Sequence, residues 1–166
     1  MPNWCNNTVT VKHSDPAMIT RVREAFEQER LCNEFLPNPN GQWSWEHSVN
    51  TWGTKWELAG EVDTIEDGVI LTFDSAWAPP TGLYNHLYSL GYEVLARYYE
   101  PGMAFAGTYE DGCDDCFDYS GMSSEEIAKY LPEELDEYFG ISENVAQWED
   151  ENSEELDEET VDSNED

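Results

Sequence analysis

The chain has 166 residues, of which 39% are hydrophobic and 13% aromatic, and a formal net charge of −30. This length favours a single domain and is sufficient to bury a core. The acidity is uneven, because residues 1–109 carry 6 basic and 14 acidic side chains whereas residues 110–166 carry 1 and 23. Such a chain repels nucleic acid and anionic membranes, so its electrostatic partners are expected to be basic proteins, cations or protein sites that normally hold nucleic acid.

Targeting and anchoring signals are not found in the sequence. The first residues lack the basic start and apolar run of a signal peptide, and no stretch approaches the roughly 20 apolar residues that cross a bilayer. Four scattered cysteines are too few for a disulfide framework. We therefore expect a soluble cytoplasmic protein of a bacterial or phage-infected cell, with no membrane partner.

The N-terminal part predicts a strand followed by a helix. Residues 8–12 alternate valines with polar side chains, as a half-buried strand does. Asp15 followed by Pro16 is a helix-start signal, and the helix is expected to run to about residue 30. Its apolar stripe has helical spacing and consists of Ile19, Val22 and Phe26.

The middle of the chain predicts a hairpin, a second helix and a further strand. Prolines and an Asn-Gly pair make residues 35–41 a loop. Strands are expected over residues 55–62 and 69–74, with Asp67 and Gly68 as the turn between them. Two prolines at 79–80 then open a helix, whose inward residues are Leu83, Leu87 and Leu90, before a strand over 93–99. Residues 102–109 add another strand or hairpin.

This order of elements predicts an α+β fold, a ferredoxin-like βαββαβ sandwich with two helices on one face of an antiparallel sheet. The sandwich domain is expected over residues 1–109. An acidic loop or hairpin and short helices follow over 110–148, where Ser123 and Glu126 form a capping box. Residues 149–166 hold 11 acidic side chains and few aliphatic ones, so we expect a disordered acidic tail.

Tryptophans cluster around two of the expected strands, in the stretches 43–56 and 73–80. Large aromatic side chains most often anchor a core, so packing is the first interpretation. The functional alternative is that some of them line a binding groove beside the one basic residue of the stretch. The candidate binding residues are Trp43, Trp45, Trp52, Lys55 and Trp77.

Residues 111–118 contain two groups of metal-binding side chains in close spacing. Cys113 and Cys116 have the spacing of a zinc or redox pair, but one such pair supplies two of the four ligands that zinc needs. Four carboxylates are weak candidates for calcium or magnesium, although they lack the pattern of an EF-hand loop. They are Asp111, Asp114, Asp115 and Asp118. A solvated acidic turn with reduced cysteines is favoured, and no metal or cofactor is expected.

Four motifs resemble the YubB ferredoxin-like domain family, in that family's order. They are MPNWCNN at 1–7, WGTKW at 52–56, FDSAWAPP at 73–80, and YEPG with FAG at 99–107. The resemblance implies a ferredoxin-like fold and a setting on plasmids or bacteriophages. It implies no catalytic residue, because members of that family have no established activity.

No nucleophile elbow, Cys–His signature or phosphate-binding loop is present, so an enzyme is not expected. The favoured function is a protein-interaction module of a mobile-element accessory protein, which binds a host or mobile-element protein through its aromatic surface and acidic C-terminus. The alternative is a nucleic-acid mimic that blocks the DNA or RNA site of a host defence or replication protein. A single-stranded nucleic-acid binder ranks last, because the domain has only six basic residues.

Overall fold

A computed structural model describes residues 2–162 of the chain, and the side chains of residues 2–153. Contacts between residues divide the chain into two compact units, Met1–Asp118 and Tyr119–Asp166. The first unit extends nine residues beyond the expected boundary at 109, because the hairpin that follows belongs to its sheet. None of the described helices combines the length and apolar composition needed to cross a membrane.

The first unit is built on a six-stranded sheet in the order β2-β3-β1-β4-β5-β6, and every neighbouring pair is antiparallel. β1 lies at the centre because both β3 and β4 pair with it. The strands are β1 Trp4–Lys12, β2 Gly60–Ile65, β3 Gly68–Ala76, β4 Glu93–Glu100, β5 Phe105–Glu110 and β6 Cys113–Asp118.

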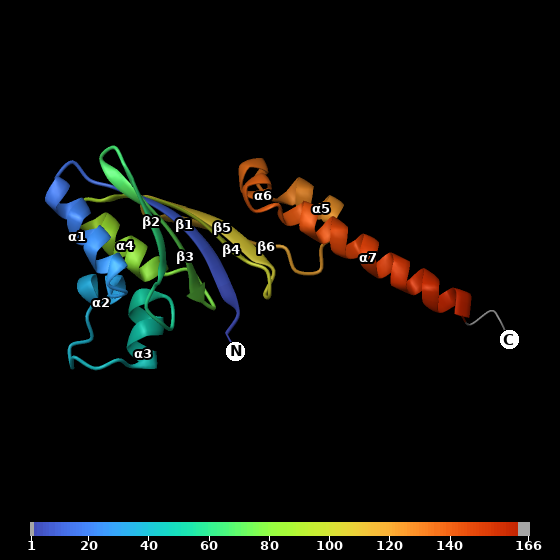
Figure 1. Cartoon of the computed structure of the whole chain (residues 1–166), viewed down its shortest axis with the longest axis horizontal. Helices are drawn as coiled ribbons and strands as arrows, with labels where there is room; N and C mark the ends of the chain where they lie inside the picture. The colour runs from blue at the N-terminus through green and yellow to red at the C-terminus, as the bar shows by residue number, and fades with distance from the viewer. Residues whose placement is uncertain (1, 163–166) are drawn as a thin grey trace. The chain divides into compact units, whose positions relative to one another are not determined.

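Helices gather over one face of this sheet (Figure 1). They are α1 Pro16–Glu27, α2 Leu31–Phe35, α3 Trp45–His47, the π-helix η1 Ser48–Trp52, and α4 Thr81–Ser89. Alternate residues of β1, among them Val9 and Val11, are buried beneath them, as the two-residue period of a strand requires. The core formed there also takes the buried side chains of α1, α2 and α4.

The prediction of an α+β fold with an antiparallel sheet is confirmed. The first four strands and the helices α1 and α4 occur in the expected chain order. The unit is nevertheless not a clean two-helix ferredoxin-like sandwich. Two further strands extend the sheet beyond β4, and three short helices that were not expected, α2, α3 and η1, lie between α1 and β2.

Three local expectations are wrong. The strand expected from residue 55 begins only at Gly60, because η1 and the turns after it occupy the preceding chain. The hairpin turn consists of residues 66–67, since Ile65 pairs with Gly68. Leu90 follows the end of α4 and is 41% exposed, whereas Leu83 and Leu87 are buried as expected.

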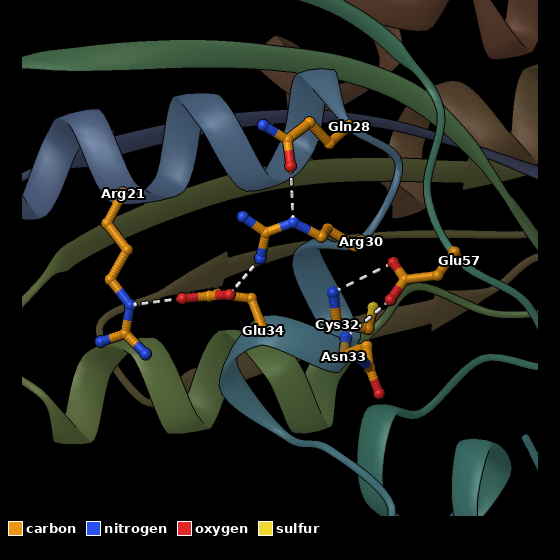
Figure 2. Close-up of polar contacts among 7 residues, drawn as sticks. All are labelled: Arg21, Gln28, Arg30, Cys32, Asn33, Glu34 and Glu57. Atoms are coloured by element: carbon orange, nitrogen blue, oxygen red, sulfur yellow. Dashed lines mark hydrogen bonds and ion pairs between the residues drawn. The ribbon is translucent and has the colours of Figure 1, made fainter. Parts of the chain in front are cut away.

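Side-chain carboxylates accept hydrogen bonds from backbone amides at the N-terminal ends of two helices. The Asp15 carboxylate accepts a hydrogen bond from the Ala17 amide at 3.0 Å, which confirms the helix-start signal. Glu57, far along the chain, accepts from the amides of Cys32 at 3.0 Å and Asn33 at 2.6 Å at the start of α2 (Figure 2). Burial raises the pKa of Glu57, and both amides oppose that rise.

Figure 2 also shows an ion-pair network that ties α1 to α2. Glu34 accepts from Arg21 Nε at 3.0 Å and is paired with Arg30, whose Nε donates to Gln28 at 2.7 Å. Both arginines lower the pKa of the Glu34 carboxyl. The Arg21 guanidinium also stacks on the Phe35 ring, 4.3 Å from its centroid, so it covers core surface as well as carrying charge.

Replacing Glu57 with alanine is expected to lower the free energy of unfolding by about 1.5 kcal/mol, because two amides at the start of α2 lose their acceptor. Glu57→Gln keeps one acceptor oxygen and should cost less. Urea denaturation of both variants measures the difference. Equal losses for alanine and glutamine would show that the carboxylate does not act as a helix cap.

The second unit is a small helical assembly, α5 Ser124–Tyr130, α6 Glu133–Phe139 and α7 Ile141–Asp162. The capping box predicted from Ser123 and Glu126 is confirmed, with both hydrogen bonds at 3.2 Å. Glu149 accepts from the amide and the hydroxyl of Ser124, which joins α7 to α5 and lowers the pKa of that carboxyl. Among its residues 119–153, the buried ones are Tyr119, Ile127, Leu131, Leu135 and Ile141.

Residues 149–162 continue α7 as a helix, where a disordered tail was expected. No glycine or proline interrupts residues 141–162, and glutamate, the commonest residue among 149–162, is a good helix former. The expectation rested on the lack of apolar surface, which governs packing rather than helix formation. The last part of the expected tail, residues 163–166, lies outside the described residues.

Candidate functional site

The structure separates the five candidate binding residues into core and surface. Trp52 is only 3% exposed, and its indole nitrogen donates to the Leu36 carbonyl at 2.7 Å. Its ring is part of the core cluster, which agrees with the packing interpretation rather than with a place on a binding surface. Trp43, Trp45 and Trp77 remain about half exposed, at 56%, 58% and 47%.

Trp45, Lys55 and Trp77 lie together at a cavity of about 470 Å³ on the first unit. Its lining is mainly apolar, and Lys55 is the one ionisable side chain among the lining residues. The complete lining consists of Trp45, Val49, Gly53, Thr54, Lys55, Ala76, Trp77 and Ala78. We call this cavity the tryptophan groove. Its volume falls within the range of sites that receive a small molecule or a few side chains.

A series of contacts leads from Lys55 to three tryptophans that do not line the groove. The Trp43 indole nitrogen donates to the Lys55 carbonyl at 3.2 Å, and the Lys55 ammonium lies over the Trp56 ring, 4.6 Å from its centroid. Trp56 in turn contacts Trp4 of β1, with ring centroids 6.0 Å apart. Trp4 and Trp56 were not among the candidates for binding.

The wall of the groove formed by η1 has unusual backbone geometry. A π-helix is rare and is often found at functional sites. Gly53 ends it with φ of 93°, and a side chain at Gly82 of α4 would meet the Thr51 carbonyl oxygen at 2.0 Å. Ser48, at the start of η1, has a buried hydroxyl without a hydrogen-bond partner among the described residues. A rare helix type and an unsatisfied polar group thus occur together beside the groove.

The opposite wall is the turn that follows β3. The Trp77 amide donates to the Asn3 carbonyl at 2.8 Å. The carbonyls of the residues before and after Trp77 are also held. The buried Thr54 hydroxyl donates to the Ala76 carbonyl at 2.9 Å, and the Ser75 hydroxyl donates to the Ala78 carbonyl at 2.7 Å. These bonds fix the backbone of the turn, so the exposed indole ring of Trp77 stands on a rigid support.

The two cysteines of the expected turn belong to strand β6, which explains why they cannot act as a pair. Residues three apart on a strand point to opposite faces of the sheet. Cys113 pairs with Glu110 and Cys116 with Gly107 of β5. Burial raises the pKa of Cys116, which is close to Tyr98. A zinc or redox site formed by this pair is therefore not supported.

The four aspartates are also separated by the hairpin. Asp111 accepts from the Val94 amide at 2.8 Å, and Asp114 accepts from the Tyr98 hydroxyl at 2.6 Å. Asp115 points to the opposite face from Asp114 because the two are consecutive on β6. Across residues 2–153, no three His, Cys, Asp or Glu side chains come close enough to hold a metal ion.

Ionisable groups buried in the first unit make its stability sensitive to alkali. Burial raises the pKa of Cys5 to about 12 and raises the pKa of Tyr84 well above its usual value. The folded chain therefore keeps protons that the unfolded chain loses. Such groups stabilise the fold fully below their unfolded pKa, near 9 for a thiol and 10 for a phenol, and less as the pH rises.

We expect the free energy of unfolding to fall by about 1 kcal/mol between pH 9 and pH 10 from Cys5 alone. Chemical denaturation at pH 8, 9, 10 and 10.5 measures this loss, and Cys5→Ala should make the decline shallower. A free energy that stays constant over this range would contradict the burial of these groups.

Comparison of the chain with protein-family profiles, curated proteins and solved structures finds no match. The function must therefore be inferred from the geometry of the chain itself.

Proposed function

We propose that this chain is a non-enzymatic binding protein whose first unit recognises a partner protein through the tryptophan groove. The observation that carries the proposal is the groove itself, an apolar cavity of about 470 Å³ between two half-exposed tryptophans. Exposing such rings to water is unfavourable, and tryptophan is among the residues most enriched at the energetic centres of protein interfaces.

The net charge of the first unit favours a partner with positive charge. Residues 1–118 carry 19 acidic and 6 basic side chains, a net charge of −13. This field attracts basic surfaces and raises association rates, and its influence decreases with added salt. The groove supplies an apolar contact that salt does not screen. We therefore propose a basic protein partner that inserts apolar side chains between Trp45 and Trp77.

Affinity capture with matched variants of the full chain tests this function. Proteins from a bacterial host lysate are captured on wild type, Trp77→Ala and Trp148→Ala, and the retained partner is then titrated with each purified variant. Trp148 is 63% exposed on α7 of the second unit, so it controls for the loss of an exposed tryptophan. We expect at least about a 30-fold loss of affinity for Trp77→Ala, as for an interface hot spot, and little change for the control. Loss with Trp148→Ala alone would place recognition in the second unit and overturn the proposal.

The biological setting is proposed from the four motifs named in the sequence. We propose a ferredoxin-like core related to the YubB domain family and a role as an accessory protein of a plasmid or bacteriophage, in the bacterial cytoplasm. The chain order of β1, α1, β2, β3, α4 and β4 supports this assignment. Two of the four motifs, WGTKW and FDSAWAPP, contribute residues to the tryptophan groove.

A nucleic-acid mimic is the second candidate function, and the helical state of α7 favours it. A mimic needs carboxylates held at a spacing close to that of duplex DNA, about one charge per 1.7 Å. Residues 149–162 carry 9 acidic side chains in 14 residues of helix. At a rise of about 1.5 Å per residue, this is about one charge per 2.3 Å. A disordered tail could not keep that spacing.

Changing Glu154, Glu155, Glu158 and Glu159 together to glutamine tests the mimic, because it removes charge and keeps good helix formers. A mimic should lose its captured nucleic-acid-handling proteins, and a short DNA duplex should compete with the wild-type chain for them. Helicity measured by circular dichroism serves as the control. Unchanged capture by the variant would exclude this candidate.

A further inference from the structure

Trp77 has a backbone conformation that its side chain does not favour. Its φ of 72° lies in the left-handed region, which is costly for a bulky residue and which glycine adopts freely. The other non-glycine residues with positive φ among those described are smaller or flexible, and they occur where a helix ends or a hairpin turns. They are Glu29, Asp67, Ala104 and Asp111. Trp77 lies instead directly after β3, in a segment that leads to α4.

A chain of buried hydrogen bonds maintains this conformation. The Tyr84 hydroxyl of α4 donates to the Asn7 side-chain oxygen at 2.9 Å, and the Asn7 side-chain nitrogen donates to the Ser75 hydroxyl at 2.8 Å. Ser75 then donates to the Ala78 carbonyl at 2.7 Å, one residue beyond Trp77. Asn7, Ser75 and Tyr84 are each about 1% exposed, so breaking the chain would leave polar groups unpaired in the core.

The unit gains little from the indole ring that this arrangement holds. Trp77 is 47% exposed, and no hydrogen bond of its side chain is observed within the described residues. A residue that is strained and also poorly buried does not serve stability. Strained conformations of this kind are concentrated at ligand-binding sites, where they keep a group ready for contact.

We propose that Trp77 is the residue that anchors the partner in the tryptophan groove, and that its occupant is an extended protein segment with one large apolar side chain flanked by lysine or arginine. This inference rests on the proposed function. The apolar lining selects the inserted side chain, and the net charge of −13 on residues 1–118 selects basic flanks. Lys55, the one charged lining residue, disfavours a cation inside the groove itself.

A displayed library of random 12-residue peptides, selected on the full wild-type chain, supplies the probe. The selected peptides should share a large aliphatic or aromatic residue and a positive net charge. Their affinity should fall at least about 30-fold on both Trp77→Ala and Trp77→Gly. Thermal unfolding gives an independent measurement: Trp77→Gly should melt about 2–4 °C above Trp77→Ala, because only glycine adopts this backbone conformation without penalty.

The possible failures can be told apart. Peptides that lose affinity on Trp45→Ala but keep it on Trp77→Ala would overturn the inference while the groove remained the binding site. Peptides that bind Trp45→Ala and Trp77→Ala as tightly as they bind the wild type would overturn the proposed function itself. Selected peptides with a negative net charge, or a Trp77→Gly variant that melts no higher than Trp77→Ala, would also contradict the inference.

Discussion

Trp52→Ala is expected to lower the free energy of unfolding by about 4 kcal/mol, the largest effect of any tryptophan substitution in this chain. Trp52 is 3% exposed and packs in the core, and it also donates from its indole nitrogen to the Leu36 carbonyl. The substitution therefore creates a cavity and removes one hydrogen bond from the partly buried Leu36 carbonyl, which also lies 3.0 Å from His47 Nε2. Its T-shaped contact with His47, at 6.0 Å between ring centroids, is lost as well.

Urea denaturation followed by circular dichroism measures this loss. Trp45→Ala is the matched control, because the same side chain is removed seven residues earlier from a position that is 58% exposed. We expect the control to change stability by less than about 0.5 kcal/mol. Similar losses for the two variants would show that the core and surface assignments of these tryptophans are wrong.

Gly82→Ala is expected to destabilise the chain by about 3 kcal/mol, although alanine is normally the better helix former. A Cβ atom at Gly82 would lie 2.0 Å from the Thr51 carbonyl oxygen and 3.0 Å from the Trp52 carbonyl carbon. Both are backbone atoms that cannot rotate away. The helix α4 would have to separate from η1, whose Val49 lines the tryptophan groove.

Thermal or urea denaturation measures the loss, and peptide affinity for the groove gives a second readout. Gly121→Ala is the control, because no atom lies within 4 Å of a Cβ at that glycine while its φ is 76°. It should cost only about 1 kcal/mol, from backbone strain alone. A Gly82→Ala variant as stable as the wild type would mean that α4 and η1 are not in close contact.

Signals that act between neighbours in the sequence predicted much of the fold. Asp15 and Pro16 define the start of α1, and the capping box at Ser123 defines the start of α5. The alternating valines of residues 8–12 predicted β1, although the strand begins earlier, at Trp4. These features depend on residues within a few positions of each other, which is why the sequence is sufficient to identify them.

The groove could be predicted only in part, because burial depends on contacts that are distant in the sequence. Nothing local distinguishes Trp52, which is buried, from Trp45, which is exposed. Glu57 was predicted to lie in a strand, because its partners, the amides of Cys32 and Asn33, are more than twenty residues away in the sequence. The left-handed conformation of Trp77 likewise has no signature in its own residue type, since tryptophan disfavours it.

The order of the sheet gives a different meaning to the carboxylates of β6. β2 and β6 are the two outer strands, and outer strands expose backbone groups that can pair with another molecule. Both carry exposed acidic side chains, Glu61 and Asp63 on β2 and Asp114 and Asp115 on β6. Charge repulsion between such strands opposes joining of sheets from separate molecules. The aspartates that resembled a cation site are therefore expected to oppose edge-to-edge aggregation of the protein.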